Sequence, residues 1–182
     1  MRRVWFLSLC LLCVLSTAQA AVPDIALQDL DGKPRNVNEF IGQGKWVIVV
    51  FWMHDCKICA GEIHHMSTFH QAHKNKDAIV LGVTIDGQAY REQARQFVAK
   101  HKLPFANLLT EPDTEAILKF GGGRFVGTPT HYFFDPIGRI VGRKIGPLSS
   151  ADLEAFIEAF NSSPYAVPPA KPQLTKPQPD KP

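Results

Sequence analysis

The sequence predicts an α/β fold, in which helices flank both faces of a central mixed β-sheet. Two continuous apolar runs, 46–52 and 78–84, are rich in β-branched residues and have the pattern of strands buried on both faces. Segments with helical spacing of apolar residues follow each run. Strands and helices thus alternate first, and a hairpin and a helix follow near the end, an order that favours a mixed sheet covered by helices.

The first half of the domain contains a hairpin, a strand and a helix. Residues 24–30 and 34–37 read as short strands joined by Asp31-Gly32, a dipeptide typical of tight turns. After the strand at 46–52 the chain must turn, and apolar residues then recur at helical spacing. This pattern predicts a helix that begins at or near Cys56.

The second half contains three further helices and a hairpin. The 88–102 segment carries apolar residues at helical spacing with charges opposite them, and a shorter helix at 112–120 ends at three consecutive glycines. Strands are predicted at 130–134 and 139–145, around the turn sequence Asp-Pro-Ile-Gly, and a last helix at 150–160.

Both ends of the chain differ in composition from the domain. Residues 1–20 contain Arg2 and Arg3, an apolar run of twelve residues and an Ala-Gln-Ala cleavage sequence, which predict a cleaved signal peptide. An uncleaved membrane anchor is the alternative. Residues 161–182 contain seven prolines and three lysines and predict a disordered tail. The folded domain is therefore expected over 21–160.

The formal charge gives no support for binding to nucleic acid or to an anionic membrane. Removal of Arg2 and Arg3 with the signal lowers it from +3 to +1, which is close to neutral. We expect no nucleic-acid partner. No dimerisation domain is visible in the sequence, and we expect a monomer.

Cys56 and Cys59 form a C-x-x-C pair and are the only cysteines left after the signal, which takes Cys10 and Cys13 with it. One bridge that closes so short a loop would stabilise the fold weakly. A thiol at a helix N-terminus ionises more readily, and the thiolate is the nucleophile. We expect Cys56 to attack a partner's disulfide and Cys59, one turn further along, to resolve the mixed disulfide.

Metal binding is the other common use of C-x-x-C. A structural zinc site needs four ligands, and no second cysteine pair exists in the mature chain. Histidines lie nearby in sequence, so a copper-binding chaperone that uses Cys56, Cys59 and a histidine stays open. We expect neither a metal nor a cofactor in the domain.

Three stretches together resemble a known family. They are PDIALQDLDGK at 23–33, FWMHDCKIC at 51–59 after the buried strand, and GTPTHYFFD at 127–135. Between Pro23 and Phe160 the chain is similar to exported thiol–disulfide oxidoreductases of the TlpA/ResA/DsbE type. The resemblance implies a thioredoxin-like fold with an N-terminal β-hairpin and a central insert. It also implies that Pro129 is a cis proline beside the sulfurs and that the backbone of Thr128 binds substrate.

The same resemblance assigns a role to Glu62, which occupies the place of the family's active-site glutamate. Its helix face also carries apolar residues, so we expect it to be partly buried and to move protons for Cys59. Val50 occupies the place of the buried aspartate of classical thioredoxins, which leaves Glu62 as the nearby carboxyl group.

Asp55 and Ile58 depart from the family pattern, and together with Lys57 they should tune the redox couple. Asp55 stands where tryptophan is common and Ile58 where proline is common. Asp55 could cap the helix, and its charge opposes ionisation of Cys56, whereas that of Lys57 favours it. The direction of electron flow is therefore open.

By resemblance, the function is that of a periplasmic reductant of specific protein disulfides. A client such as apocytochrome c before haem attachment would be reduced, and a membrane donor of the DsbD/CcdA type would return electrons to Cys56 and Cys59. A disulfide oxidant or isomerase is the alternative within the same chemistry.

Overall fold

A mixed sheet of seven strands lies at the centre of the computed structural model, which describes residues 22–112 and 114–166. The strand order is β2-β1-β5-β4-β3-β6-β7. The parallel strands β3, β4 and β5 form its middle, and the antiparallel pairs β1–β2 and β6–β7 form its two edges. The strands are β1 Ala26–Asp29, β2 Pro34–Asn36, β3 Trp46–Trp52, β4 Ala78–Thr84, β5 Asn107–Leu109, β6 Thr130–Phe134 and β7 Ile140–Ile145.

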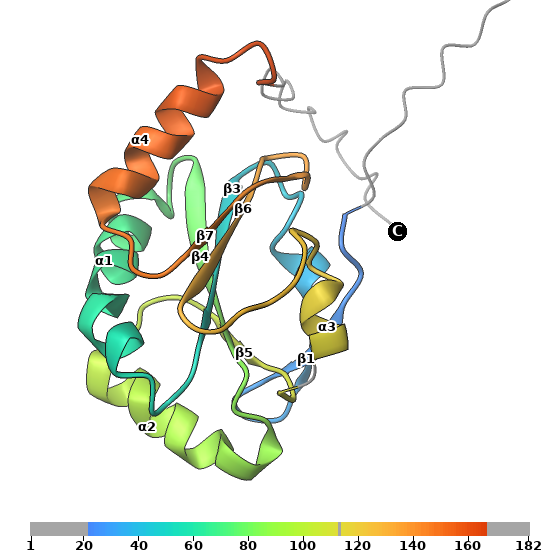
Figure 1. Cartoon of the computed structure of the whole chain (residues 1–182), viewed down its shortest axis with the longest axis vertical. Coiled ribbons are helices and arrows are strands. Elements are labelled where there is room, and N and C mark those ends of the chain that lie inside the picture. The colour runs from blue at the N-terminus through green and yellow to red at the C-terminus, as the bar shows by residue number, and fades with distance from the viewer. Residues whose placement is uncertain (1–21, 113, 167–182) are drawn as a thin grey trace, which may run out of the picture.

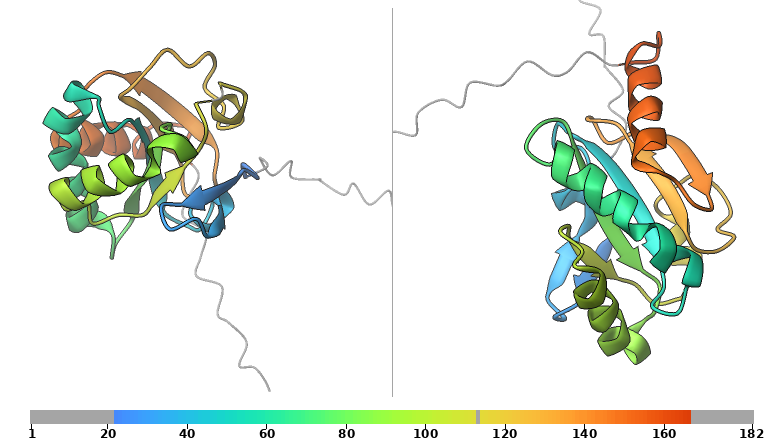
Figure 2. Two further views of the ribbon diagram at one scale, coloured as in Figure 1. Left: turned by 90° about the horizontal axis from the view of Figure 1, so that it is seen from below. Right: turned by 90° about the vertical axis from the view of Figure 1, so that its left-hand side faces the viewer.

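The helices cover both faces of this sheet, as the sequence predicts, but unequally. Figure 1 shows α4, α1 and α2 along one side of the sheet and α3 on the other, and Figure 2 shows α1 lying lengthwise over the strands. The α-helices are α1 Lys57–His73, α2 Arg91–His101, α3 Thr114–Leu118 and α4 Ser150–Asn161; the short 3-10 helices are η1 Val37–Glu39 and η2 Gln88–Tyr90.

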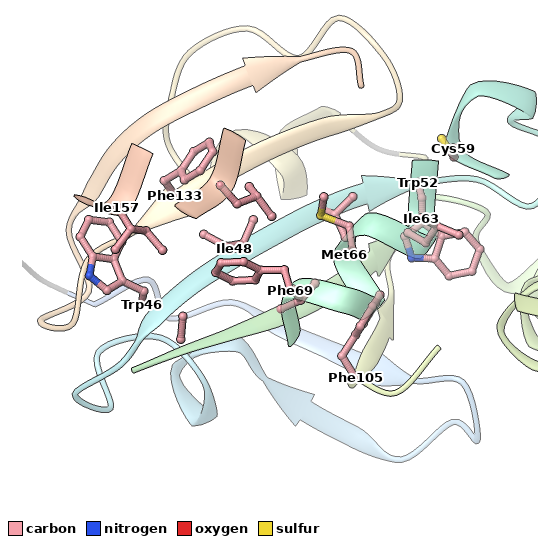
Figure 3. Close-up of a cluster of buried hydrophobic side chains, with 14 of the residues drawn as sticks. Trp46, Ile48, Trp52, Cys59, Ile63, Met66, Phe69, Phe105, Phe133 and Ile157 are labelled. Atoms are coloured by element: carbon pink, nitrogen blue, oxygen red, sulfur yellow. The ribbon is translucent and has the colours of Figure 1, made fainter. Parts of the chain in front are cut away.

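Alternation along β3 divides the core into two layers. Every side chain of β3 is buried, in agreement with its continuous apolar run. Trp46, Ile48, Val50 and Trp52 pack with α1, α2 and α4, whereas the residues between them pack with η1 and α3. Figure 3 shows the first layer, with Cys59 at its end beyond Trp52 and Ile63. The redox pair therefore sits at the border of a packed core.

A polar contact holds the last residue of β3 in this core. The Trp52 Nε1–H donates to Asn107 Oδ1 at 3.1 Å, and the Asn107 amide nitrogen donates to the Phe105 carbonyl oxygen at 2.9 Å. The Trp52 ring stacks on Phe97 of α2 with 4.6 Å between centroids. Gly82 leaves the room that this arrangement needs, because a Cβ there would lie 2.0 Å from Asn107 Oδ1.

Three elements differ from the sequence prediction. The strand β5 was not predicted. The helix expected over 88–102 is divided, because Tyr90 leaves the helical conformation and separates η2 from α2. The helix expected over 112–120 is only α3, since the backbone closes into tighter turns from Phe120 to Gly121.

The N-terminal hairpin is confirmed, with Leu27 opposite Arg35, and the segment between β4 and β6 holds α2, β5 and α3. The predicted signal peptide 1–20 lies outside the described residues, and so does the predicted tail 161–182 from residue 167 onward. The first residue of that predicted tail, Asn161, is the last residue of α4. Within the part of the chain that the structure describes, no helix has the length and apolarity to cross a membrane.

Candidate redox site

Cys56 and Cys59 are joined by a disulfide, with their Cα atoms 5.2 Å apart. Cys56 is the N-cap of α1, and its sulfur accepts the backbone N–H of Cys59 at 3.1 Å. Cys56 is partly exposed, whereas Cys59 is fully buried. The pair therefore has one sulfur that a partner can reach and one that it cannot, as expected from the sequence.

The local sequence explains why the pair lies at this edge. β3 ends at Trp52, and the Cys56 N–H donates to the Met53 carbonyl oxygen at 3.2 Å, which turns the chain into α1. Carboxyl ends of parallel strands are the usual site edge of α/β sheets. The unpaired N–H groups of the first turn of α1 favour negative charge at the Cys56 sulfur.

Thr128 and Pro129 lie beside the disulfide, although they are far from it in sequence. The Thr128–Pro129 peptide bond is cis, and the Cys56 sulfur is 3.8 Å from the Thr128 carbonyl oxygen. The pairing of β6 with β3 and β7 begins at Thr130, so Thr128 lies outside this ladder. The structure thus brings together the two segments that the resemblance relied on.

Only 5 % of the surface of Glu62 is exposed, so the residue is buried more deeply than expected from the sequence. Its Oε2 accepts the backbone N–H of Leu148 at 2.8 Å. Its Oε1 lies 3.2 Å from Nε2 of His131, whose side chain is fully buried. Because Glu62 follows Cys59 by three residues, the two side chains lie on the same face of α1, and the Leu148 N–H holds the carboxyl group there.

His131 is the residue that the sequence reasoning missed. It lies in β6, whose residues are all buried, and Tyr132 and Phe134 of the same strand face the opposite layer. The available signal was a histidine two residues after Pro129 at an inward position of a buried strand.

The three residues expected to tune the redox couple lie on the surface. Asp55, Lys57 and Ile58 are exposed, and Ile58 exposes 58 % of its surface. The expectation that Asp55 caps the helix is wrong, because the Cys56 sulfur takes the N-cap position and accepts the free N–H.

His54 forms a second polar contact before the redox pair. Its Nδ1 is 2.6 Å from Oδ1 of the buried Asp86, and its backbone N–H donates to the same carboxyl group at 3.0 Å. Its ring stacks on Tyr90. These contacts fix the segment between β3 and Cys56.

The histidines of α1 differ in their exposure. His70 is buried, and its Nδ1 accepts the Val80 N–H at 3.1 Å. Burial lowers the pKa of His70, and the nearby lysines Lys74 and Lys45 lower it further. Over residues 22–112 and 114–166, no three His, Cys, Asp or Glu side chains are grouped so that they could hold a metal ion.

Known proteins resemble the chain along most of the domain. The model of the AhpC/TSA family matches residues 18–143. The thiol-disulfide oxidoreductase ResA of Bacillus cereus is 25 % identical over 136 residues, which cover 75 % of this chain and 74 % of ResA.

Two solved structures extend the comparison to the fold. The thioredoxin domain of a thiol-disulfide oxidoreductase from Bacteroides vulgatus is 28 % identical, with a TM-score of 0.62, and the match covers 78 % of this chain and 96 % of that domain. A thioredoxin-family thiol:disulfide interchange protein from Chlorobium tepidum is 24 % identical, with a TM-score of 0.65 and coverage of 78 % and 95 %. The resemblance and the thioredoxin-like fold predicted from the sequence are confirmed, and this chain belongs to the AhpC/TSA family.

Proposed function

We propose that this chain is an exported thiol–disulfide oxidoreductase that reduces the disulfides of specific client proteins. The observation that carries the proposal is the Cys56–Cys59 disulfide at the N-terminus of α1, beside Thr128 and Pro129. A formed disulfide is the product state of such a reductant, and the relatives named thiol-disulfide oxidoreductase support the activity.

The unequal exposure of the two sulfurs supports the order of steps. The thiolate of reduced Cys56, stabilised by the helix N-terminus and by the Cys59 N–H, attacks one sulfur of the client disulfide. A mixed disulfide forms and the second client sulfur leaves as a thiolate. Cys59 then loses its proton and attacks the Cys56 sulfur, which releases the reduced client and regenerates the Cys56–Cys59 disulfide. Two electrons pass from the protein to the client.

Glu62 is the group proposed to take the proton from Cys59. It is buried on the same face of α1 as Cys59, where bulk water does not supply a base. General bases at hydrogen-bonding distance accelerate proton transfer by typically about 10² to 10⁴-fold. The Leu148 N–H holds one oxygen of the carboxyl group, and His131 Nε2 lies 3.2 Å from the other.

Thr128 is proposed to bind the client backbone. It lies outside the sheet ladder and beside Cys56, so its peptide groups can pair with an extended client strand. The exposed apolar side chains Ile58 and Val126 belong to the two segments that meet at Cys56, and they offer contact for apolar residues of the client. Asp55 precedes Cys56, and Lys57 and Ile58 lie between the two cysteines. These three residues would tune the reduction potential of the couple.

Location and partners complete the proposal. Residues 1–20 would direct export, with the periplasm as the compartment. An apocytochrome c awaiting haem would be a client of this kind, and a membrane donor of the DsbD/CcdA type would reduce the couple again. We propose that the protein acts as a monomer.

Trapping the client tests this proposal. The Cys59→Ser variant should accumulate a mixed disulfide through Cys56 with its client in the envelope of its own cells. Non-reducing electrophoresis and mass spectrometry would identify the adduct, and Cys56→Ser is the matched control that should form none. Adducts formed equally by both variants, or by neither, would exclude Cys56 as the nucleophile.

A further inference from the structure

We propose that His131 is a positioning residue for the redox reaction: its Nε2 lies 3.2 Å from Glu62 Oε1 and, by donating to this oxygen during the reaction, orients the carboxyl group to take the proton of Cys59. This inference rests on the proposed function, and in particular on the role proposed for Glu62. It gives a role to a buried histidine that has none in the reaction scheme proposed above.

The sheet places His131 on the same side as the redox pair. Residues alternate along β6, so His131 and Phe133 face the layer of α1, whereas Tyr132 faces the other layer. His131 lies opposite Val50 of β3, which belongs to the layer that contains Cys59. The histidine therefore approaches α1 from the sheet.

The burial of His131 makes its partner important. Its side chain is fully buried, and among the described residues neither ring nitrogen nor Glu62 Oε1 has a hydrogen-bond partner, although Nε2 lies only 3.2 Å from Oε1. A buried polar group without a partner costs free energy, so such groups are kept where they pair. Catalytic hydrogen bonds are commonly loose in the resting state and tighten during reaction. Glu62 is the group to which the ring can donate.

Glu62 and His131 have different roles in the resolving step. The carboxylate of Glu62 takes the proton from the Cys59 thiol, and the resulting thiolate attacks the Cys56 sulfur and expels the client thiolate. His131 neither gives up nor takes up a proton in this step. By donating to Oε1 while Leu148 donates to Oε2, it holds the carboxyl group in the orientation that the transfer needs.

Other titratable groups surround the pair and contribute to any pH profile. Cys59 and His65 lie one turn before and after Glu62 on α1, and Lys144 lies opposite His131 on β7. Asp152, at the start of α4, interacts with both His65 and Lys144. The side chains of β3 on this face are apolar. A test must therefore isolate the contribution that depends on Glu62.

The reaction of the reduced full-length protein with 5,5′-dithiobis(2-nitrobenzoate) separates the two steps. The attack of Cys56 releases a first equivalent of nitrothiobenzoate, and resolution by Cys59 releases the second. Stopped-flow traces between pH 4.5 and 9 give a rate profile for each. Failure of the first phase would refute Cys56 as nucleophile, whereas failure of the His131 proposal would affect only the second.

His131→Leu should slow the second phase by about 10- to 100-fold across the profile, the equivalent of one hydrogen bond to a charged group. The first phase should not change. His131→Gln, which keeps an N–H at the same place, should retain the wild-type profile and also serves if the leucine variant does not fold.

The double variant Glu62→Gln/His131→Leu should have the same profile as Glu62→Gln alone. Three outcomes would overturn the proposal: a wild-type second phase in His131→Leu, a loss in His131→Gln that equals the loss in His131→Leu, or a further effect of His131→Leu when Glu62 is already replaced.

Discussion

Gly82→Ala should destabilise the protein strongly, because it removes the space in which Trp52 and Asn107 meet. A Cβ on Gly82 would lie 2.0 Å from Asn107 Oδ1 and 3.0 Å from Trp52 Nε1, the two atoms joined by a buried hydrogen bond. The Asn107 amide cannot easily swing away, since its nitrogen donates to the Phe105 carbonyl oxygen. The new methyl group must therefore displace the indole or the amide.

Two costs add up. Overpacking of a core costs about 1 to 3 kcal/mol, and a broken buried hydrogen bond that leaves its atoms unpaired costs about 1 to 3 kcal/mol. We expect a loss of about 2 to 6 kcal/mol in the free energy of unfolding, measured by urea denaturation of the oxidised protein.

Gly61→Ala is the matched control. Gly61 lies in α1 with no atom within 4 Å of the position of its missing Cβ, and its backbone φ is not positive. The same substitution there should stabilise the protein by about 0.5 to 1 kcal/mol, because alanine favours the helix. Equal free energies of unfolding in the two variants would refute the reasoning about Gly82.

Three further predictions concern a buried histidine, a helix cap and the surface beside the sulfurs. The pKa of His70 lies below its ordinary value of 6.5, so the unfolded chain binds more protons, and the contribution of His70 to stability is complete above pH 6.5 and is lost as the pH falls through the folded pKa. His70→Asn, whose amide oxygen can accept the Val80 N–H, should lose less stability than wild type between pH 7.5 and 5 in urea unfolding; an equal loss would contradict this account. Ser149→Ala removes the side chain that accepts the Asp152 N–H at the start of α4 and should cost about 1 kcal/mol in the same assay, and an unchanged midpoint would show that the cap contributes nothing. Ile58→Ser removes an exposed apolar side chain beside Cys56 and should raise the KM for a protein disulfide severalfold while the rate with 5,5′-dithiobis(2-nitrobenzoate) stays unchanged; a loss with both substrates would assign Ile58 to the chemistry instead.

Long apolar patterns predicted most of the fold. The strands β3 and β4 were predicted with their observed bounds, because strands buried on both faces have unbroken apolar sequences. The strand β5 was not predicted, because it has three residues and begins with Asn107, whose buried amide depends on Trp52 from another strand. A single sequence shows no local pattern for such a contact.

The site was predictable where its residues lie close together in sequence or match a family motif. Cys56 and Cys59 are recognisable from their spacing and from the strand before them. The cis bond before Pro129 was expected from the resemblance and is present. The role of His131 was not predicted from the sequence, because it depends on the contact with Glu62, which lies on another element. The capping assignment of Asp55 was wrong, since Cys56 is the N-cap and its sulfur accepts the Cys59 N–H.

The reduction potential of the Cys56–Cys59 couple tests the proposed direction of electron flow most directly. The full-length protein would be equilibrated in dithiothreitol or glutathione buffers of graded potential, and its thiols would be alkylated and counted. A reductant of client disulfides should have a potential near that of thioredoxin, about −270 mV. A value near about −120 mV, typical of strong oxidants of this chemistry, would mean that the protein takes electrons from its clients and would contradict the proposal.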